Sequence, residues 1–247
     1  MMKTRSLTVG PVTLLRGDAM RLLPALQEKA DLLLTDPPYK LTSGGRNSQV
    51  MGGIFSSAEY DNSGILMPVV PWKEMAPALF EACGRDADGY VMSNDKNVFD
   101  ANNAFLAAGW KFHNLLVWDK ITPTRNRWYM KELEFTLYLW KGRAKTIRRP
   151  GSKQRFECHR PEDRFHRTQK PVDLMEHYIL NSTDPGQLVL DPFAGSAATL
   201  VAAMRTGRRA IGCELNPKWF DMAAARLEAE WAVLSRGVRK TTHMMAS

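Results

Sequence analysis

Short apolar runs alternate with amphipathic stretches along most of this 247-residue chain. Leu32-Leu33-Leu34 is typical of the apolar runs, and a run of this length followed by prolines predicts a buried strand. The stretch 19–28 places its apolar residues at helical spacing and predicts an amphipathic helix. The same patterns predict strands at 12–15, 32–35, 89–93, 112–118, 133–140, 187–191 and 209–214. They predict helices at 19–28, 71–83, 97–108, 171–182 and 217–231, and one that begins near 199.

This alternation predicts an α/β fold with a mostly parallel sheet. The successive strands 112–118 and 133–140 predict an antiparallel hairpin at the edge of that sheet. The chain is long enough for a full core and contains no low-complexity linker, so residues 1–247 are expected to form a single domain. Within it, residues 40–64 are rich in Gly, Ser and Asn and follow neither period, which predicts a mobile loop.

A candidate for chemistry follows the strand 32–35, where the chain reads Asp36-Pro37-Pro38-Tyr39. Two successive prolines end a sheet ladder, because neither has a backbone N–H to donate. Ligands of open α/β sheets bind beyond the carboxyl ends of the strands, so a carboxylate and an aromatic ring held there are well placed to act. The alternative is an ordinary turn after a strand, in which Asp and Pro are common.

A second candidate is the segment 187–199, which predicts a buried strand, a tight turn of small residues and the start of a helix. Gly195 permits a close approach to the backbone, and the helix N-terminus offers free N–H groups. About twenty residues later the strand 209–214 ends in Glu214, at the spacing where Rossmann-like folds bind ribose hydroxyls. Each feature alone is common in α/β proteins, but together they predict a nucleoside site.

The tetrapeptide Asp36-Pro37-Pro38-Tyr39 resembles the catalytic motif of amino-group DNA methyltransferases, which methylate N6 of adenine or N4 of cytosine. The segment 191–199 is similar to the D-P-F-x-G-S-G-T cofactor motif of the same enzymes. The catalytic motif comes first, a basic segment second and the cofactor loop last, which is the order of the group called class β. The resemblance extends from 12 to about 227 and implies a Rossmann-like, S-adenosylmethionine-dependent methyltransferase fold for a single methyltransferase domain.

The resemblance implies direct attack by an exocyclic amine, whose lone pair is delocalised into the base until acceptors engage its N–H groups. The Asp36 carboxylate and the Pro37 carbonyl would be those acceptors, and Pro38 would keep the turn rigid. Tyr39 would stack on a base flipped out of the duplex. A ring-carbon methyltransferase would need a cysteine nucleophile, and no cysteine lies in a comparable proline turn.

The cofactor implied by the resemblance is S-adenosylmethionine. Asp191, Phe193, Gly195 and Ser196 match the cofactor motif, and Glu214 would bind the ribose. The remaining implied contacts are Asp18 to the adenine, and Thr168 and Lys170 of a T-Q-K-P segment to the methionine carboxylate.

Two of these positions carry open alternatives. Asp18 stands where a strand meets a helix, so it is also a candidate helix N-cap, and both roles are compatible. Ala197 replaces the second glycine of the cofactor motif. If its φ is positive, its Cβ is costly and cofactor binding could suffer; if its φ is negative, alanine simply favours the helix.

The net charge of +8 suggests a polyanionic partner, and the resemblance makes that partner double-stranded DNA. The basic segment 142–167 lies where the resemblance places target recognition, although a charge run is also typical of a solvated surface. A second stretch, 120–129, combines basic and aromatic residues. The candidate DNA contacts are Arg46, Arg125, Arg127, Trp128, Arg148, Arg149, Lys153 and Arg155.

Other features restrict the setting. The three cysteines form no CxxC pair and stand near no pair of histidines, so neither a disulfide framework nor a metal site is expected. No apolar run approaches the length of a membrane span, and the N-terminus lacks the apolar character of a signal peptide, so a cytoplasmic protein is expected. A homodimer is compatible with the short recognition segment, and no residue pattern identifies a restriction endonuclease partner of a restriction-modification system.

Asp at the head of the tetrapeptide goes mostly with adenine in this family and Ser mostly with cytosine, so N6 of adenine is the expected target. The alternatives are an N4-cytosine enzyme and a DNA-binding homologue impaired through Ala197. A methyltransferase acting on RNA or protein would use a similar tetrapeptide that often begins with Asn, so Asp36 and the basic segment disfavour it.

Overall fold

The computed structural model describes residues 5–39, 69–124, 129–162 and 168–245, without the side chains beyond 236. The strands are β1 (Ser6–Val9), β2 (Val12–Arg16), β3 (Ala30–Thr35), β4 (Cys83–Ser93), β5 (Lys111–Thr124), β6 (Lys131–Trp140), β7 (Arg155–Glu157), β8 (Leu188–Asp191) and β9 (Arg209–Glu214). The helices are α1 (Ala19–Leu22), the 3-10 turn η1 (Leu23–Ala25), α2 (Trp72–Ala82), α3 (Val98–Ala107), α4 (Val172–Ser182), α5 (Ala198–Arg205) and α6 (Pro217–Met245).

The described strands form a single sheet in the order β1-β2-β9-β8-β3-β4-β6-β5-β7. Its centre is parallel, since β2, β9, β8, β3 and β4 pair side by side in one direction. β6 runs antiparallel to both β4 and β5, which is the expected hairpin, and β7 continues the sheet beyond β5. The predicted α/β class with a mostly parallel sheet is therefore confirmed.

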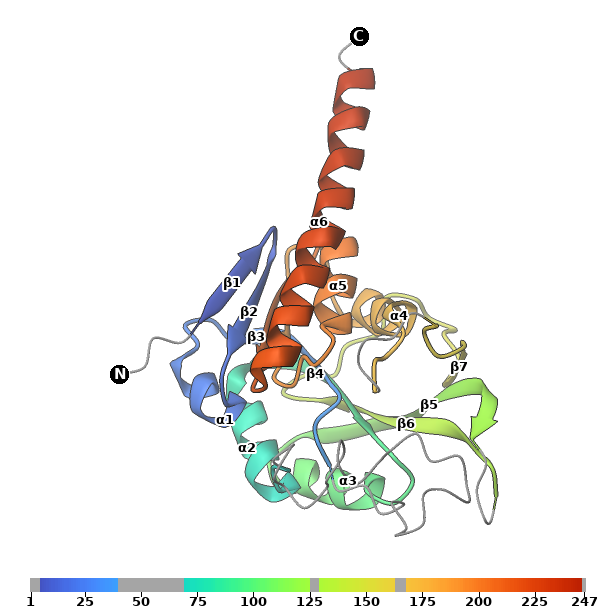
Figure 1. Cartoon of the computed structure of the whole chain (residues 1–247). Helices are drawn as coiled ribbons and strands as arrows, with labels where there is room; N and C mark the ends of the chain where they lie inside the picture. The colour runs from blue at the N-terminus through green and yellow to red at the C-terminus, as the bar shows by residue number, and fades with distance from the viewer. Residues whose placement is uncertain (1–4, 40–68, 125–128, 163–167, 246–247) are drawn as a thin grey trace.

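Helices cover both faces of the sheet (Figure 1). On one face α4, α5 and α6 pack on the strands and bury residues such as Leu174, Leu200 and Phe220. On the other face α2 and α3 do the same, with Met75 and Phe105 among the buried residues. The strands between the two layers are buried on both sides, which explains why β3 reads as an uninterrupted apolar run.

Several predicted elements differ in length. The helix expected at 19–28 divides into α1 and the turn η1, because Pro24 has no N–H to continue the α-helical pattern. β1, which pairs with β2, was not predicted, and β4 begins at Cys83 rather than 89. α6 continues past the expected end at 231 and projects from the body of the fold (Figure 1).

The order of the central strands positions the site. β3 lies between β4 and β8 in the sheet. After β3 the chain adds β4 on one side, and after β8 it adds β9 on the other side. Such a switch in direction opens a crevice at the carboxyl ends of the two strands. The tetrapeptide follows β3 and the small-residue turn follows β8, so both begin at this crevice.

Candidate active site

A buried hydrogen bond connects the two sequence motifs. β3 and β8 pair directly, with Leu32 opposite Val189 and Leu33 opposite Leu190. At the ends of these strands Thr35 Oγ1 donates to Asp191 Oδ1 across 2.9 Å, although the two residues are 156 positions apart. The fold therefore brings Asp36 beside the first residue of the small-residue turn.

The two oxygens of Asp36 have different surroundings. Oδ2 accepts a hydrogen bond from the Lys170 ammonium group. Oδ1 is buried and accepts no hydrogen bond from any residue that the structure describes. Burial raises the pKa of Asp36, and the nearby Lys170 charge opposes that shift. One acceptor of the carboxylate is thus held by the protein and the other is left for a ligand.

The rest of the tetrapeptide follows directly after the end of β3. Pro37 is buried, whereas Pro38 and Tyr39 are half-buried. The Tyr39 ring stacks beside Trp72 at the start of α2, with ring centroids 6.1 Å apart and an interplanar angle of 20°. Tyr39 is therefore held by an aromatic neighbour, as a stacking platform should be.

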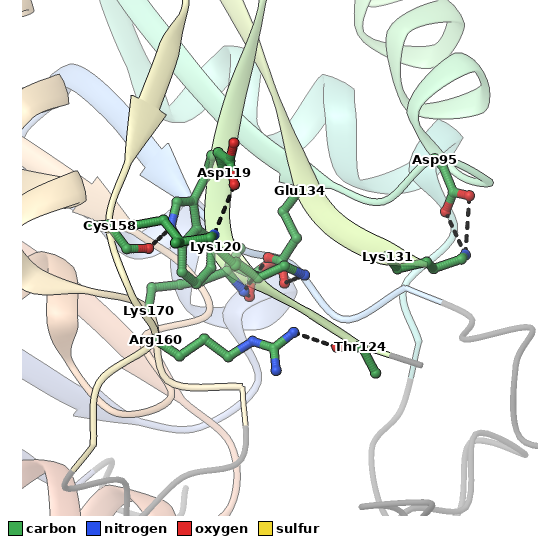
Figure 2. Close-up of polar contacts among 12 residues, drawn as sticks. Asp95, Asp119, Lys120, Thr124, Lys131, Glu134, Cys158, Arg160 and Lys170 are labelled. Carbon is green, nitrogen blue, oxygen red and sulfur yellow. Dashed lines mark hydrogen bonds and ion pairs between the residues drawn. The ribbon is translucent and has the colours of Figure 1, made fainter. Parts of the chain in front are cut away.

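Lys170 belongs to a buried network of alternating charges (Figure 2). Its Nζ lies 3.4 Å from Glu134 Oε2, and Lys120 Nζ donates to Glu134 Oε1 across 3.1 Å. Burial alone would lower the pKa of Lys170, but the carboxylates of Asp36 and Glu134 outweigh it and raise that pKa. Burial likewise opposes ionisation of Glu134, yet the two ammonium groups lower its pKa. Both groups are therefore charged at neutral pH.

The turn after β8 is organised by backbone donors. Phe193 N donates to Asp191 Oδ1 across 3.2 Å, and Gly195 N donates to Glu214 Oε2 across 3.0 Å. Asn216 N donates to Glu214 Oε1 across 2.7 Å. Burial raises the pKa of Asp191 to about 6 and that of Glu214 to about 7, although these hydrogen bonds oppose it.

These residues fit the cofactor implied by the sequence. Glu214 is only half-buried, and each carboxylate oxygen retains a second lone pair that can accept from a ribose hydroxyl. Asp18 stands close to it, because Arg16 of β2 is opposite Glu214 and Gly17 N donates to the Glu214 carbonyl across 3.0 Å. Asp18 also caps α1 by accepting from Met20 N at 3.0 Å, so the N-cap alternative is confirmed and leaves the proposed cofactor contact compatible.

Ala197 has the left-handed backbone that a glycine would adopt most easily, with φ 60° and ψ 28°. Its side chain is fully buried in the main core cluster rather than exposed at the turn. Next to it, Ser196 is buried and its carbonyl accepts from Arg226 Nη1 at 2.8 Å. The φ angle of Ala197 is therefore positive, and the methyl group that a glycine would lack packs in the core.

The expected role of Lys170 toward a cofactor carboxylate stays a prediction, since its ammonium already has two carboxylate partners in the structure. Thr168, two residues earlier, is half-buried at the same entrance to α4. Sequence reasoning missed Glu134, Lys120 and Thr35. A glutamate between the apolar residues Leu133 and Phe135 of a predicted strand was the one local sign of the network.

The basic segment 142–167, described as far as 162, contributes β7 to the sheet and packs against α4, where Arg148 N donates to the Asn181 carbonyl. Arg148 pairs with Asp184, and Arg155 pairs with Asp119 at 2.7 Å and with Glu157 at 2.9 Å. Arg149 and Lys153 are exposed. The expected contacts Arg46, Arg125, Arg127 and Trp128 and the expected mobile loop 40–64 lie outside the described residues.

Across the ranges that the structure describes, no helix is both long and apolar enough to cross a membrane. The same ranges contain no cluster of three His, Cys, Asp or Glu side chains arranged to hold a metal ion.

Two solved structures share this fold. M1.HpyAVI, in a complex with SAM, covers 87% of this chain and 99% of its own with a TM-score of 0.67 and 23% identity. The cytosine-N4-specific PvuII DNA methyltransferase covers 91% of this chain and 93% of its own, with a TM-score of 0.68 and 16% identity.

Sequence relatives extend over nearly the whole chain. The type II methyltransferase M2.DpnII of Streptococcus pneumoniae is 27% identical in an alignment 245 residues long that covers 88% of this chain and 90% of the relative. M2.LlaDCHI of Lactococcus lactis subsp. cremoris is 26% identical in an alignment 242 residues long that covers 87% of this chain and 88% of the relative. The sequence profile of the N6/N4 family, described as DNA methylase, matches residues 30–225. The chain therefore belongs to the N6/N4 family of DNA methylases.

Proposed function

We propose that this DNA methylase transfers the methyl group of S-adenosylmethionine to N6 of an adenine flipped out of duplex DNA. The observation that most supports this is the 2.9 Å hydrogen bond from Thr35 to Asp191. This bond connects β3, which leads into the tetrapeptide, to β8, which leads into the candidate cofactor turn. The amine and the methyl donor would therefore meet at one crevice.

The residues around the amine have distinct tasks. Oδ1 of Asp36 and the carbonyl of Pro37 accept from the two N–H groups, which localises the nitrogen lone pair for attack. When bound, S-adenosylmethionine supplies a methyl group on a positively charged sulfur. Burial raises the pKa of Asp36, so its carboxylate is suited to take the proton that the amine loses. Tyr39 stacks on the flipped base.

The cofactor is held by the opposite wall of the crevice. Glu214 accepts from the ribose hydroxyls, Asp18 faces the adenine, and the backbone at Phe193 and Gly195 lines the approach. Asp191 keeps the turn closed through its bonds to Thr35 and Phe193. Ser196 of the same turn and Thr168 before α4 complete the proposed cofactor contacts.

The choice of adenine rests on Asp36 as the first residue of the tetrapeptide. N4 of cytosine is the second candidate, because its amine is chemically equivalent and the cytosine-N4-specific PvuII enzyme shares the fold. The sequence relatives are type II methyltransferases of bacteria, which supports a duplex DNA substrate in the cytoplasm and a modification role. A homodimer would extend the short recognition segment 142–167.

The test is to incubate the purified protein with methyl-labelled S-adenosylmethionine and unmethylated duplex DNA, digest the DNA to nucleosides and separate them. Label in N6-methyladenine supports the proposal. Label in N4-methylcytosine would show that cytosine, not adenine, is the target base. Asp36→Ala is expected to lower transfer by about 100-fold or more while calorimetry still detects cofactor binding. Asp95→Ala, which removes an exposed ion pair with Lys131, is the matched control. Absence of label from wild-type reactions would reject the function.

A further inference from the structure

We propose that Lys170 and Glu134 are positioning residues for the catalytic carboxylate, which fix Asp36 so that only Oδ1 faces the substrate amine. The proposal rests on the proposed methyl transfer at Asp36. It differs from the role expected for Lys170, which was contact with the methionine carboxylate of the cofactor.

The two oxygens of the Asp36 carboxylate differ in their hydrogen bonding. Lys170 is 7% exposed and donates to Oδ2, so rotation of the carboxylate would break a buried, charged hydrogen bond. Oδ1 is buried without a donor among the described residues. An unsatisfied buried acceptor is costly, and a ligand N–H is the group that would satisfy it. The arrangement therefore prepares one oxygen for the amine.

Lys170 is itself held in place by Glu134. Glu134 bridges two ammonium groups, at 3.4 Å to Lys170 and 3.1 Å to Lys120. The four side chains, Asp36 included, balance two negative and two positive charges in a buried space, where any one charge left alone would be costly. Figure 2 shows Lys120, Glu134 and Lys170 converging from three different segments.

The backbone is strained beside Lys120. Ile121 has φ 64°, a conformation that β-branched residues rarely adopt, and its N–H donates to Asp119 Oδ1 at 2.8 Å. The strand bulges here, since the pairing of β5 with β6 shifts between Asp119 and Thr124. The distortion coincides with the inward placement of Lys120, which is 6% exposed. The hairpin therefore accepts strain at Ile121, next to the residue that completes the network.

Two substitutions should move the titration of Asp36 in opposite directions. Lys170→Met removes the neighbouring positive charge, so the pKa of Asp36 should rise. Glu134→Gln removes a neighbouring negative charge with little change in shape, so the same pKa should fall. Asp191 also interacts electrostatically with Asp36, and Tyr39 with Lys170, and neither residue changes in these variants.

The experiment measures both consequences. Carbon-13 NMR of labelled Asp carboxyls, with Asp36 assigned from the Asp36→Asn spectrum, follows the titration in cofactor-free protein. Single-turnover methyl transfer at saturating cofactor and DNA follows the acid limb of the pH profile. We expect Lys170→Met to move the limb to higher pH, so that transfer at a fixed pH on the limb slows by about tenfold or more, and Glu134→Gln to move it to lower pH. Lys131→Met, which removes the exposed pair with Asp95, is the matched control and should move neither.

Each outcome decides between the roles. If Lys170→Met weakens cofactor binding and leaves the Asp36 titration and the acid limb unchanged, the positioning role is overturned in favour of the cofactor contact. If Lys170→Met does not fold, a downward shift in Glu134→Gln supports the proposal and an unchanged pKa overturns it. If wild-type protein transfers no methyl group, the proposed function itself fails, whereas normal transfer without the two shifts rejects only the positioning role.

Discussion

Ala197 illustrates how a single residue can depart from a motif at little cost. A left-handed conformation costs a non-glycine residue about 1 to 2 kcal/mol. Its methyl group is fully buried in the main core, which contributes about 0.8 kcal/mol of stabilisation. Alanine also loses less backbone entropy on folding than glycine, by about 0.5 to 1 kcal/mol. The strain and the gains nearly cancel.

Ala197→Gly should therefore change the free energy of unfolding by less than about 1 kcal/mol in urea denaturation. Cofactor affinity measured by calorimetry should stay within about threefold, because the methyl group lies in the core and not at the turn. Ala197→Val should destabilise the protein by about 2 kcal/mol or more, since a β-branched residue fits neither the φ nor the space. A tenfold gain in affinity for the glycine variant would instead mean that the methyl group obstructs the cofactor.

Glu214 should make cofactor binding depend on pH. Burial raises its pKa to about 7, so the carboxyl is mostly protonated at pH 6 and ionised at pH 8. An ionised carboxylate accepts hydroxyl hydrogen bonds more strongly, so affinity for S-adenosylmethionine should rise across this range. Glu214→Gln should weaken binding about tenfold at pH 8 and remove most of this rise, as measured by calorimetry. Glu230→Gln, which affects a pair with Arg205 between α5 and α6, is the control and should retain the rise.

At the scale of elements, the basic segment is anchored to the sheet. β7 pairs with β5, with Trp118 opposite Phe156, and Trp118 Nε1 donates to the Cys158 carbonyl across 2.9 Å. The segment therefore presents its charges from a fixed position next to the hairpin of β5 and β6. Arg148 is already paired with Asp184, whereas Arg149 is exposed.

Charge reversal at both Arg148 and Arg149 should lower DNA affinity and flatten its dependence on salt, because each lost phosphate contact removes about 0.9 from the slope of log K against log salt. Because Arg148 already forms an ion pair with Asp184, we expect the slope to change by nearly the amount for one phosphate contact rather than two. Fluorescence anisotropy of duplex DNA at several salt concentrations measures the slope. Arg5→Glu, an exposed residue beside β1 at the edge of the sheet opposite to β7, should leave the slope nearly unchanged, and an equal effect there would assign the result to net charge alone.

At the scale of the whole molecule, the two motifs lie side by side because β3 and β8 are neighbours at the centre of the sheet. The residue that joins them, Asp191, is buried, and burial raises its pKa from the ordinary 3.8 to about 6. A carboxyl with a raised pKa binds its proton more tightly in the folded protein. Its contribution to stability is therefore present at low pH and is lost as the pH rises through about 6.

The free energy of unfolding of the wild type should consequently fall relative to Asp191→Asn, by up to about 3 kcal/mol, between pH 3.8 and about 7. Urea denaturation of both proteins at about pH 3.5 and about pH 7.5, on either side of this range, measures the difference. A constant difference between the two proteins would mean that Asp191 titrates in the folded state as it does in the unfolded chain. Asp184→Asn, which removes an exposed carboxyl, is the control.

Much of the fold could be predicted from the sequence, since the strands of the parallel centre have continuous apolar runs and the principal helices have amphipathic spacing. The helix at 19–28 was predicted too long because Pro24 cannot donate the hydrogen bond that the apolar spacing suggests. The strands β1 and β7 were missed because their formation depends on the strands with which they pair. Both candidate motifs were found because each is local: prolines end a strand after Asp36, and small residues follow Asp191.

By itself, then, the sequence determined the alternation of elements, the two motifs and the family to which they belong, because each depends on residues close together in the chain. Only the tertiary structure decided that Thr35 joins the motifs, that Lys170 turns toward Asp36 and Glu134, and that Ala197 takes a positive φ. These features depend on contacts between distant segments. Burial and charge pairing select among conformations that the local sequence leaves equally accessible.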